Sequence, residues 1–153
     1  MTVATRVEIK GLRELGEAMK ALGNDVGLKI ARSATNAGAQ VIKRRAKELA
    51  PVAPEPYTIE GVIVQPGNIG KNIVVKRLKR GQTQLTSEHV VTVRGKAKYG
   101  YASRVGALQE FGTVKQSAQP FMRPAFEQEK GFAVQKIRET LKRRIDKAQK
   151  GGK

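Results

Sequence analysis

Cysteine is absent from the 153-residue chain, and His89 is its only histidine. The lack of cysteine excludes disulfides, thiolate nucleophiles and cysteine-based zinc sites. One histidine among scattered carboxylates also fails to make a zinc site or a Ser-His-Asp triad. We therefore expect no catalytic residues, no metal site and no cofactor, and we predict that the protein is not an enzyme.

Long apolar runs are also missing, and no segment is long and apolar enough to span a bilayer. Residues 1–5, Met-Thr-Val-Ala-Thr, lack the apolar stretch of a signal peptide. We therefore expect synthesis in the cytoplasm and no membrane partner.

Aromatic residues make up only 5% of the chain, so the core has to be mostly aliphatic and small. Acidic residues are few as well, because 13 Asp and Glu stand against 30 Lys and Arg, for a formal net charge of +17. Such an excess favours an anionic neighbour, either nucleic acid or an acidic protein surface. The hydrophobic fraction of 39% is typical of a globular protein, and the length suits one domain.

The N-terminal third has the apolar spacing of two helices. The first is predicted to begin near Leu12 and to stop at Gly23 and Asn24, which tolerate the left-handed backbone of a helix end. Asp25 is predicted to cap the second helix, which spans residues 26–49 and is ended by prolines. Alanine and glycine in its middle let another backbone approach closely. Its predicted apolar face consists of Val26, Ile30, Ala34, Ala37, Val41 and Leu49.

Proline, glycine and β-branched residues organise the middle of the chain. Residues 51–70 are predicted to form a long loop, with a brief extended arm at 57–64. Residues 72–78 and 89–94 have the composition of two strands and predict a hairpin with a long connection. A further short strand is predicted near residues 7–9.

The C-terminal part predicts a short helix or turn from Tyr101 to Thr113, followed by a long helix. Pro124 suits the first turn of that long helix, and residues 149–153 are predicted to fray. The apolar stripe of the helix consists of Phe126, Ala133, Ile137, Leu141 and Ile145. This order of elements predicts one α+β domain over residues 1–153, with long helices packed on a small antiparallel sheet.

Two motifs in the last third of the chain are specific enough to be hard to meet by chance. Residues 109–113 are Gln-Glu-Phe-Gly-Thr, and residues 119–125 are Gln-Pro-Phe-Met-Arg-Pro-Ala. Together with Ala-Lys-Glu-Leu-Ala-Pro-Val at 46–52, they resemble the tail-completion, or minor tail (head–tail joining), proteins of lambda-like long-tailed bacteriophages. The resemblance covers nearly the whole chain. The sequence departs from the family pattern at 53–66, where a Pro-rich insertion replaces the usual Asp-Thr-Gly.

The resemblance implies a structural virion protein of the neck or tail that is made in the bacterial host cytoplasm. Implied partners are copies of itself in a ring, sixfold to match a tail tube, and other neck or tail proteins. These include the tail terminator, the tail tube and the head-closure ring, with packaged DNA as a further candidate. The alternative, which rests on charge alone, is a free nucleic-acid-binding architectural protein. It predicts tight, steeply salt-dependent binding by the isolated chain.

Candidate partner contacts are the Glu-Phe-Gly-Thr motif and three apolar residues of the arm, namely Glu110, Phe111, Gly112, Thr113, Tyr57, Ile59 and Ile63. The motif also suits an internal turn. In that alternative Phe111 anchors in the core, Gly112 takes a positive φ angle and Thr113 bonds to nearby backbone. Glu110 is expected to pair with a basic residue of the same or the next subunit.

Two basic clusters are candidate contacts to DNA or to an acidic partner, although each also suits a solvated face. The first lies on and after the first predicted hairpin strand and consists of Lys71, Lys76, Arg77, Lys79 and Arg80. Charges on an exposed strand edge also discourage uncontrolled strand pairing. The second lies on the C-terminal helix and consists of Lys142, Arg143, Arg144 and Lys147. A structural role is predicted for Pro120, Phe121, Arg123 and Pro124. The two prolines make the entry to the last helix rigid, and Phe121 packs against the start of that helix.

Overall fold

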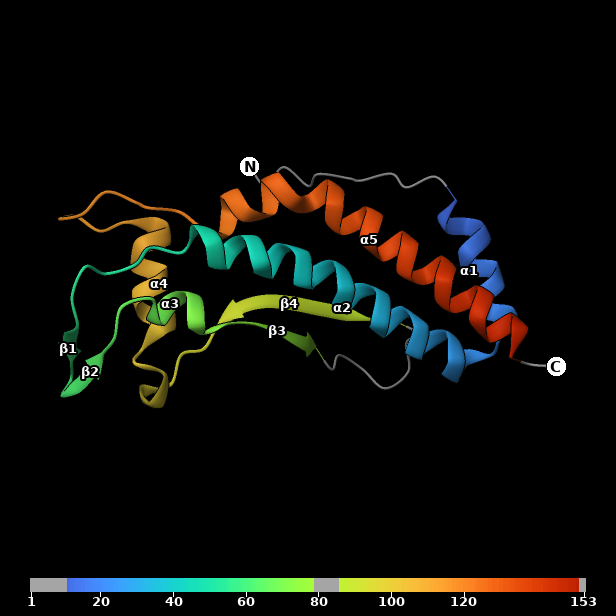
Figure 1. The fold of residues 1–153 in the computed structure, drawn as a ribbon, viewed down its shortest axis with the longest axis horizontal. Helices are drawn as coiled ribbons and strands as arrows, with labels where there is room; N and C mark the ends of the chain where they lie inside the picture. The colour runs from blue at the N-terminus through green and yellow to red at the C-terminus, as the bar shows by residue number, and fades with distance from the viewer. Residues whose placement is uncertain (1–10, 79–85, 152–153) are drawn as a thin grey trace.

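The computed structural model describes residues 11–78 and 86–151, so the strand predicted near residues 7–9 lies outside the described part. Two long helices, α2 (Asn24–Leu49) and α5 (Met122–Lys150), lie side by side along the molecule (Figure 1). Helix α1 (Leu12–Ala21) packs on both of them near the C-terminal end of α5. Strands β3 (Ile73–Leu78) and β4 (Glu88–Val93) form an antiparallel hairpin against α2. The predicted α+β class is confirmed.

The shorter elements gather at the end of the molecule opposite α1 (Figure 1). Strands β1 (Tyr57–Ile59) and β2 (Val62–Val64) form a small hairpin, which confirms the predicted arm. They are joined there by α3 (Asn68–Lys71), the 3-10 turn η1 (Ala97–Tyr99) and α4 (Ala102–Phe111). Helix α3 was not predicted, because four residues are too few to show a helical period.

The β3–β4 hairpin has one face toward α2. Successive side chains of a strand alternate between faces. On the inner face, Val91 and Val93 pack on the core, and His89 Nδ1 lies 2.9 Å from Thr35 Oγ1 of α2. Arg77 pairs with His89 in register and shares this face, whereas Lys76 lies on the outer face.

The core is aliphatic and small, as the composition predicts. One cluster joins α2, α3, β3 and α5 through Ala46, Ala50, Ile69, Ile73, Phe121 and Ala125. The other joins α2 and α5 under α1 through Ile30, Ala34, Leu141 and Ile145. Phe121, with 1% of its surface exposed, is the only aromatic residue buried to this degree among those described.

Three details of the predicted helices were wrong. Val26 and Phe126 are exposed, while their neighbours Gly27 and Ala125 are buried, because the helices approach each other over their smaller residues. Asp25 does not cap α2, which begins at Asn24 after Gly23 and has no side-chain cap. Helix α5 extends through Lys150, into the segment that was expected to fray.

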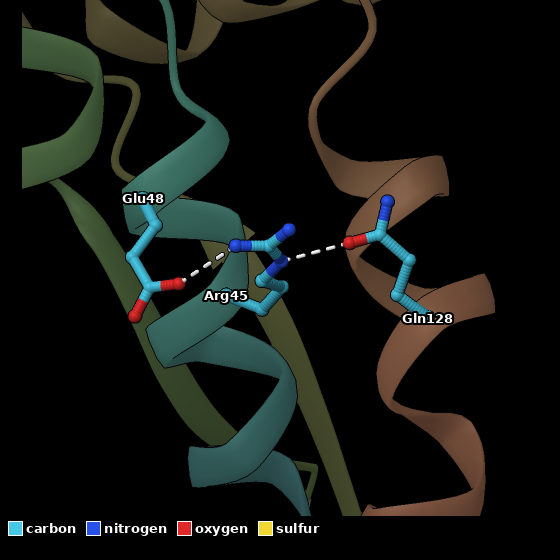
Figure 2. Close-up of polar contacts among 3 residues, drawn as sticks. All are labelled: Arg45, Glu48 and Gln128. Atoms are coloured by element: carbon cyan, nitrogen blue, oxygen red, sulfur yellow. Dashed lines mark hydrogen bonds and ion pairs between the residues drawn. The ribbon is translucent and has the colours of Figure 1, made fainter.

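Polar contacts also join the two long helices. Arg45 of α2 donates from Nε to Gln128 Oε1 of α5 at 2.8 Å and from Nη1 to Glu48 Oε2 at 3.0 Å (Figure 2). Arg45 therefore links α5 to the last turns of α2. Within the described ranges, no helix combines the length and the apolar character that crossing a membrane requires.

Candidate functional site

Glu110 lies on the last turn of α4 and binds the start of α5. Its carboxylate accepts backbone N–H groups of Phe121 at 2.7 Å, Met122 at 2.9 Å and Arg123 at 3.0 Å. The first N–H groups of a helix have no partner within the helix, so the carboxylate takes the role of a cap. The sequence predicted a basic side chain as the partner of Glu110, whereas its hydrogen bonds come from backbone N–H groups of the same subunit.

The setting of Glu110 changes its acidity. Burial by itself would raise its pKa, but the three backbone hydrogen bonds and the positive charge of Arg123 together hold the pKa below its usual value. The ionised carboxylate therefore stabilises the junction between α4 and α5. This junction carries both specific motifs, and the structural role predicted for Phe121 agrees with its burial in the core.

The residues after Glu110 form a tight turn that projects Val114 into solvent. Gly112 has φ +75°, as the internal-turn interpretation predicts. Thr113 Oγ1 accepts the backbone N–H of Lys115 at 3.2 Å, and Thr113 and Gln116 exchange two backbone hydrogen bonds. The predicted local bonding of Thr113 is therefore confirmed, and Val114 at the tip is fully exposed.

The internal-turn interpretation was wrong about Phe111. Its side chain is 72% exposed and does not anchor in the core. Adjacent helical residues point about 100° apart, so burial of Glu110 turns Phe111 outward. Leu108, one turn earlier on α4, is also exposed. Phe111 and Val114 are thus exposed apolar residues three positions apart at this end of the molecule, and the partner contact of Phe111 stays a prediction.

The β1–β2 arm lies at the same end. Ile63 is exposed, while Tyr57 and Ile59 are half-buried. Glu60 and Gly61 form the turn with positive φ angles of 49° and 80°, the combination that a two-residue hairpin turn favours. Of the predicted arm residues, Ile63 is therefore the one that offers most surface to a partner.

A clasp holds the arm against α4. Arg104 Nη1 donates to Glu60 Oε1 at 2.8 Å, and the Tyr101 hydroxyl shares a hydrogen bond with Glu60. The hydrogen bonds from Tyr101 and Arg104 lower the pKa of Glu60, so the clasp favours its ionised form. Sequence patterns missed this clasp because its partners lie far apart in the chain and belong to no motif.

A groove separates the arm from the turn at 112–116. Its lining includes Val52, Tyr57, Ile69, Gln109 and Gln116. Val52 is exposed at its rim. The groove is open and carries no group of His, Asp or Glu suited to a metal; no such group is found elsewhere in the described part of the chain.

The predicted basic clusters are not brought together. Lys71 and Lys76 are exposed on α3 and β3, and Arg77 lies on the hairpin face that meets α2. Lys79 and Arg80 lie outside the described residues. The second cluster lies on the last turns of α5. All of its residues are exposed, namely Lys142, Arg143, Arg144 and Lys147. The end of α5 lies far from α3 in Figure 1, so the two clusters belong to different surfaces.

Comparison with known proteins gives one result. Residues 13–112 match the family described as "Bacteriophage HK97-gp10, putative tail-component". The matched segment covers α1 to α4, the arm and the motif through Gly112. No curated protein and no solved structure gives a significant match.

Proposed function

Because the chain belongs to the HK97-gp10-like family of bacteriophage tail components, we propose that it acts in tail completion by assembling into a ring at the neck or tail end of the virion. The family is one of structural tail components and not of enzymes. Copies of the chain form the ring, sixfold to match a tail tube. The ring contacts the tail terminator, the tail tube or the head-closure ring.

The exposed apolar groups at one end of the molecule carry this proposal. Phe111, Val114 and Ile63 are exposed there, on two segments that backbone bonds and the Glu60 clasp hold in place. Exposed apolar groups on a rigid frame are typical of a protein interface, since little conformational entropy is lost on binding. These residues contact the next copy or the adjoining ring.

The same proposal gives the positive charge a role. The exposed cations of α3, β3 and the end of α5 face the packaged DNA or acidic neighbouring proteins. The alternative, a free architectural protein that binds nucleic acid, is favoured only by the net charge of +17. It requires tight binding by the isolated chain, with an affinity that falls steeply as salt rises.

Complementation of a phage that lacks this gene tests the proposal. The wild-type chain should restore plaques, whereas Phe111→Ser combined with Val114→Ser should give particles that stop before the tail is joined or completed. Both residues are exposed, so the thermal midpoint of the variant should stay near that of the wild type. Phe132→Ser is the matched control, since Phe132 is similarly exposed on α5 at a distance from this end, and it should restore plaques. Normal plaques from the double variant would overturn the proposed contact surface.

A further inference from the structure

A third group of basic residues, besides the two basic clusters, lies on the turn that follows β4. Residues 94–98, called here the basic turn, are Arg-Gly-Lys-Ala-Lys, and all five are exposed. The cations of Arg94 and Lys98 lie 5.0 Å and 5.1 Å from the centre of the Tyr99 ring. A cation over an aromatic face is attracted by the ring, so Tyr99 gives these two long side chains a common support.

Hydrogen bonds fix the backbone under the basic turn. Asn68 Nδ2 donates to the carbonyls of Tyr99 at 3.0 Å and Gly100 at 3.1 Å. Asn72, which is buried, donates in turn to Asn68 Oδ1 at 2.8 Å. Two asparagines of the α3 segment thus hold the carbonyl side of the turn, and its cations project from a rigid frame.

The frame also brings Lys71 close to the basic turn. The backbone N–H of Arg94 donates to the carbonyl of Asn72 at 3.0 Å, so the residue after Lys71 is bonded to the first residue of the turn. No Asp or Glu occurs between His89 and Gln109 in the sequence. The ion pairs found within residues 11–78 and 86–151 use other cations, so these four charges have no carboxylate partner there.

We propose that the basic turn, together with Lys71, binds the phosphate backbone of duplex DNA. Phosphate contacts need fixed positive charge and carry no sequence preference. A protein partner fits less well, because interface cores are depleted of charge and enriched in apolar groups, and no large apolar side chain is exposed between Arg94 and Arg104. Stacking on single-stranded bases needs a free aromatic face, whereas the Tyr99 ring already carries two cations.

This inference goes beyond the proposed function, because it names a DNA contact that does not depend on ring formation. It shares Lys71 with the first basic cluster, but the basic turn itself was not among the expected DNA contacts. The basic turn and the apolar groups Phe111 and Val114 involve different side chains. A change in DNA affinity is therefore distinguishable from a failure of assembly.

Fluorescence anisotropy with a short labelled duplex tests the inference. The comparison is between Lys96→Gln with Lys98→Gln and a control, Lys20→Gln with Lys29→Gln, which removes the same charge from exposed positions of α1 and α2 that belong to no proposed DNA contact. Between about 50 and 200 mM salt, loss of two phosphate contacts should reduce the slope of log affinity against log salt by about 1.8. The control should keep the wild-type slope. Equal losses in both variants, or no binding by the wild type at the lowest salt, would overturn the inference.

Tyr99 supplies an independent check on the frame. Tyr99→Phe keeps the ring and should keep wild-type affinity, while Tyr99→Leu should weaken binding without changing the folded fraction seen by circular dichroism. Equal affinities of Tyr99→Leu and Tyr99→Phe would contradict the role given to the ring. A single-stranded oligonucleotide of the same length should compete less well than the duplex; stronger competition by the single strand would contradict the assignment to duplex DNA.

Discussion

Ile137 of α5 packs directly over Gly38 of α2. A Cβ atom built on Gly38 would lie 2.6 Å from Ile137 Cγ1 and 3.0 Å from the carbonyl oxygen of Ala133. The first contact is with a branched side chain and the second with helix backbone, so neither neighbour can yield easily. The small residues predicted to admit another backbone therefore admit α5 of the same chain.

Gly38→Ala should separate the two long helices. Overpacking of a well-filled core costs about 1–3 kcal/mol, which exceeds the gain of roughly 0.5–1 kcal/mol that alanine brings to a helix interior. Urea unfolding should show a lower midpoint. Gly131→Ala is the matched control, since Gly131 lies in α5 with nothing within 4 Å of its added Cβ, and it should be stabilising. A stabilising Gly38→Ala would show that the helices are not in close contact.

Glu110→Ala should destabilise the α4–α5 junction by about 2–3 kcal/mol, because three backbone donors lose a charged acceptor. Glu127→Gln is the control, since Glu127 is an exposed ion-pair partner of Lys130 and such pairs contribute little. Denaturant unfolding of both variants measures the difference. Equal effects would exclude the capping role of Glu110.

The lowered pKa of Glu110 also makes a prediction about pH. Its stabilising effect is fully present above the usual carboxyl value of 4.5 and is lost as pH falls through the lower pKa of the folded state. Glu110→Gln should therefore flatten the acid limb of the stability curve. An unchanged acid limb in this variant would mean that Glu110 titrates normally in the folded protein.

Gly112→Ala should disturb the turn that projects Val114. An added Cβ would lie 2.8 Å from the backbone nitrogen of Ala118 and 3.0 Å from the carbonyl oxygen of Gln116, at a φ of +75°. Gly61→Ala has similar φ strain in open space and should cost only about 1 kcal/mol. The free energy of unfolding should fall further for Gly112→Ala. Equal losses would show that the close approach to Ala118 is absent.

His89 should make stability fall in mildly acidic solution. Burial lowers its pKa below the ordinary 6.5, and the nearby charge of Arg77 adds to the effect. The unfolded chain then binds the proton more readily, so stability is greatest above 6.5 and declines as pH falls toward the folded pKa. His89→Asn, which keeps a polar atom near Thr35, should remove the decline in this range. A decline that persists in the variant would have another source.

Periodicity and glycine chemistry predict most of the fold, because both act locally. The two long helices, the β3–β4 hairpin, the positive φ of Gly112 and the local bond of Thr113 all follow from short-range rules. The cap formed by Glu110 could not be predicted in this way. Its donors are backbone groups 11–13 residues further along the chain, and nothing in their side chains indicates them.

In the candidate site, too, local rules predict some features while others depend on contacts between distant segments. The motif at 109–113 indicates where the site lies, but exposure of Phe111 depends on which neighbour is buried, and that is decided by packing against α5. The basic turn was missed for a related reason. The backbone of the turn is fixed by Asn68 and Asn72, which belong to a segment more than twenty residues earlier in the chain.

Cryo-electron microscopy of purified virions tests the central claim most directly. The account predicts a ring of copies of this chain at the neck or tail end, with Phe111, Val114 and the β1–β2 arm in contact with a neighbouring copy or the adjoining ring. Particles that are complete in every layer and yet contain none of this chain would contradict it.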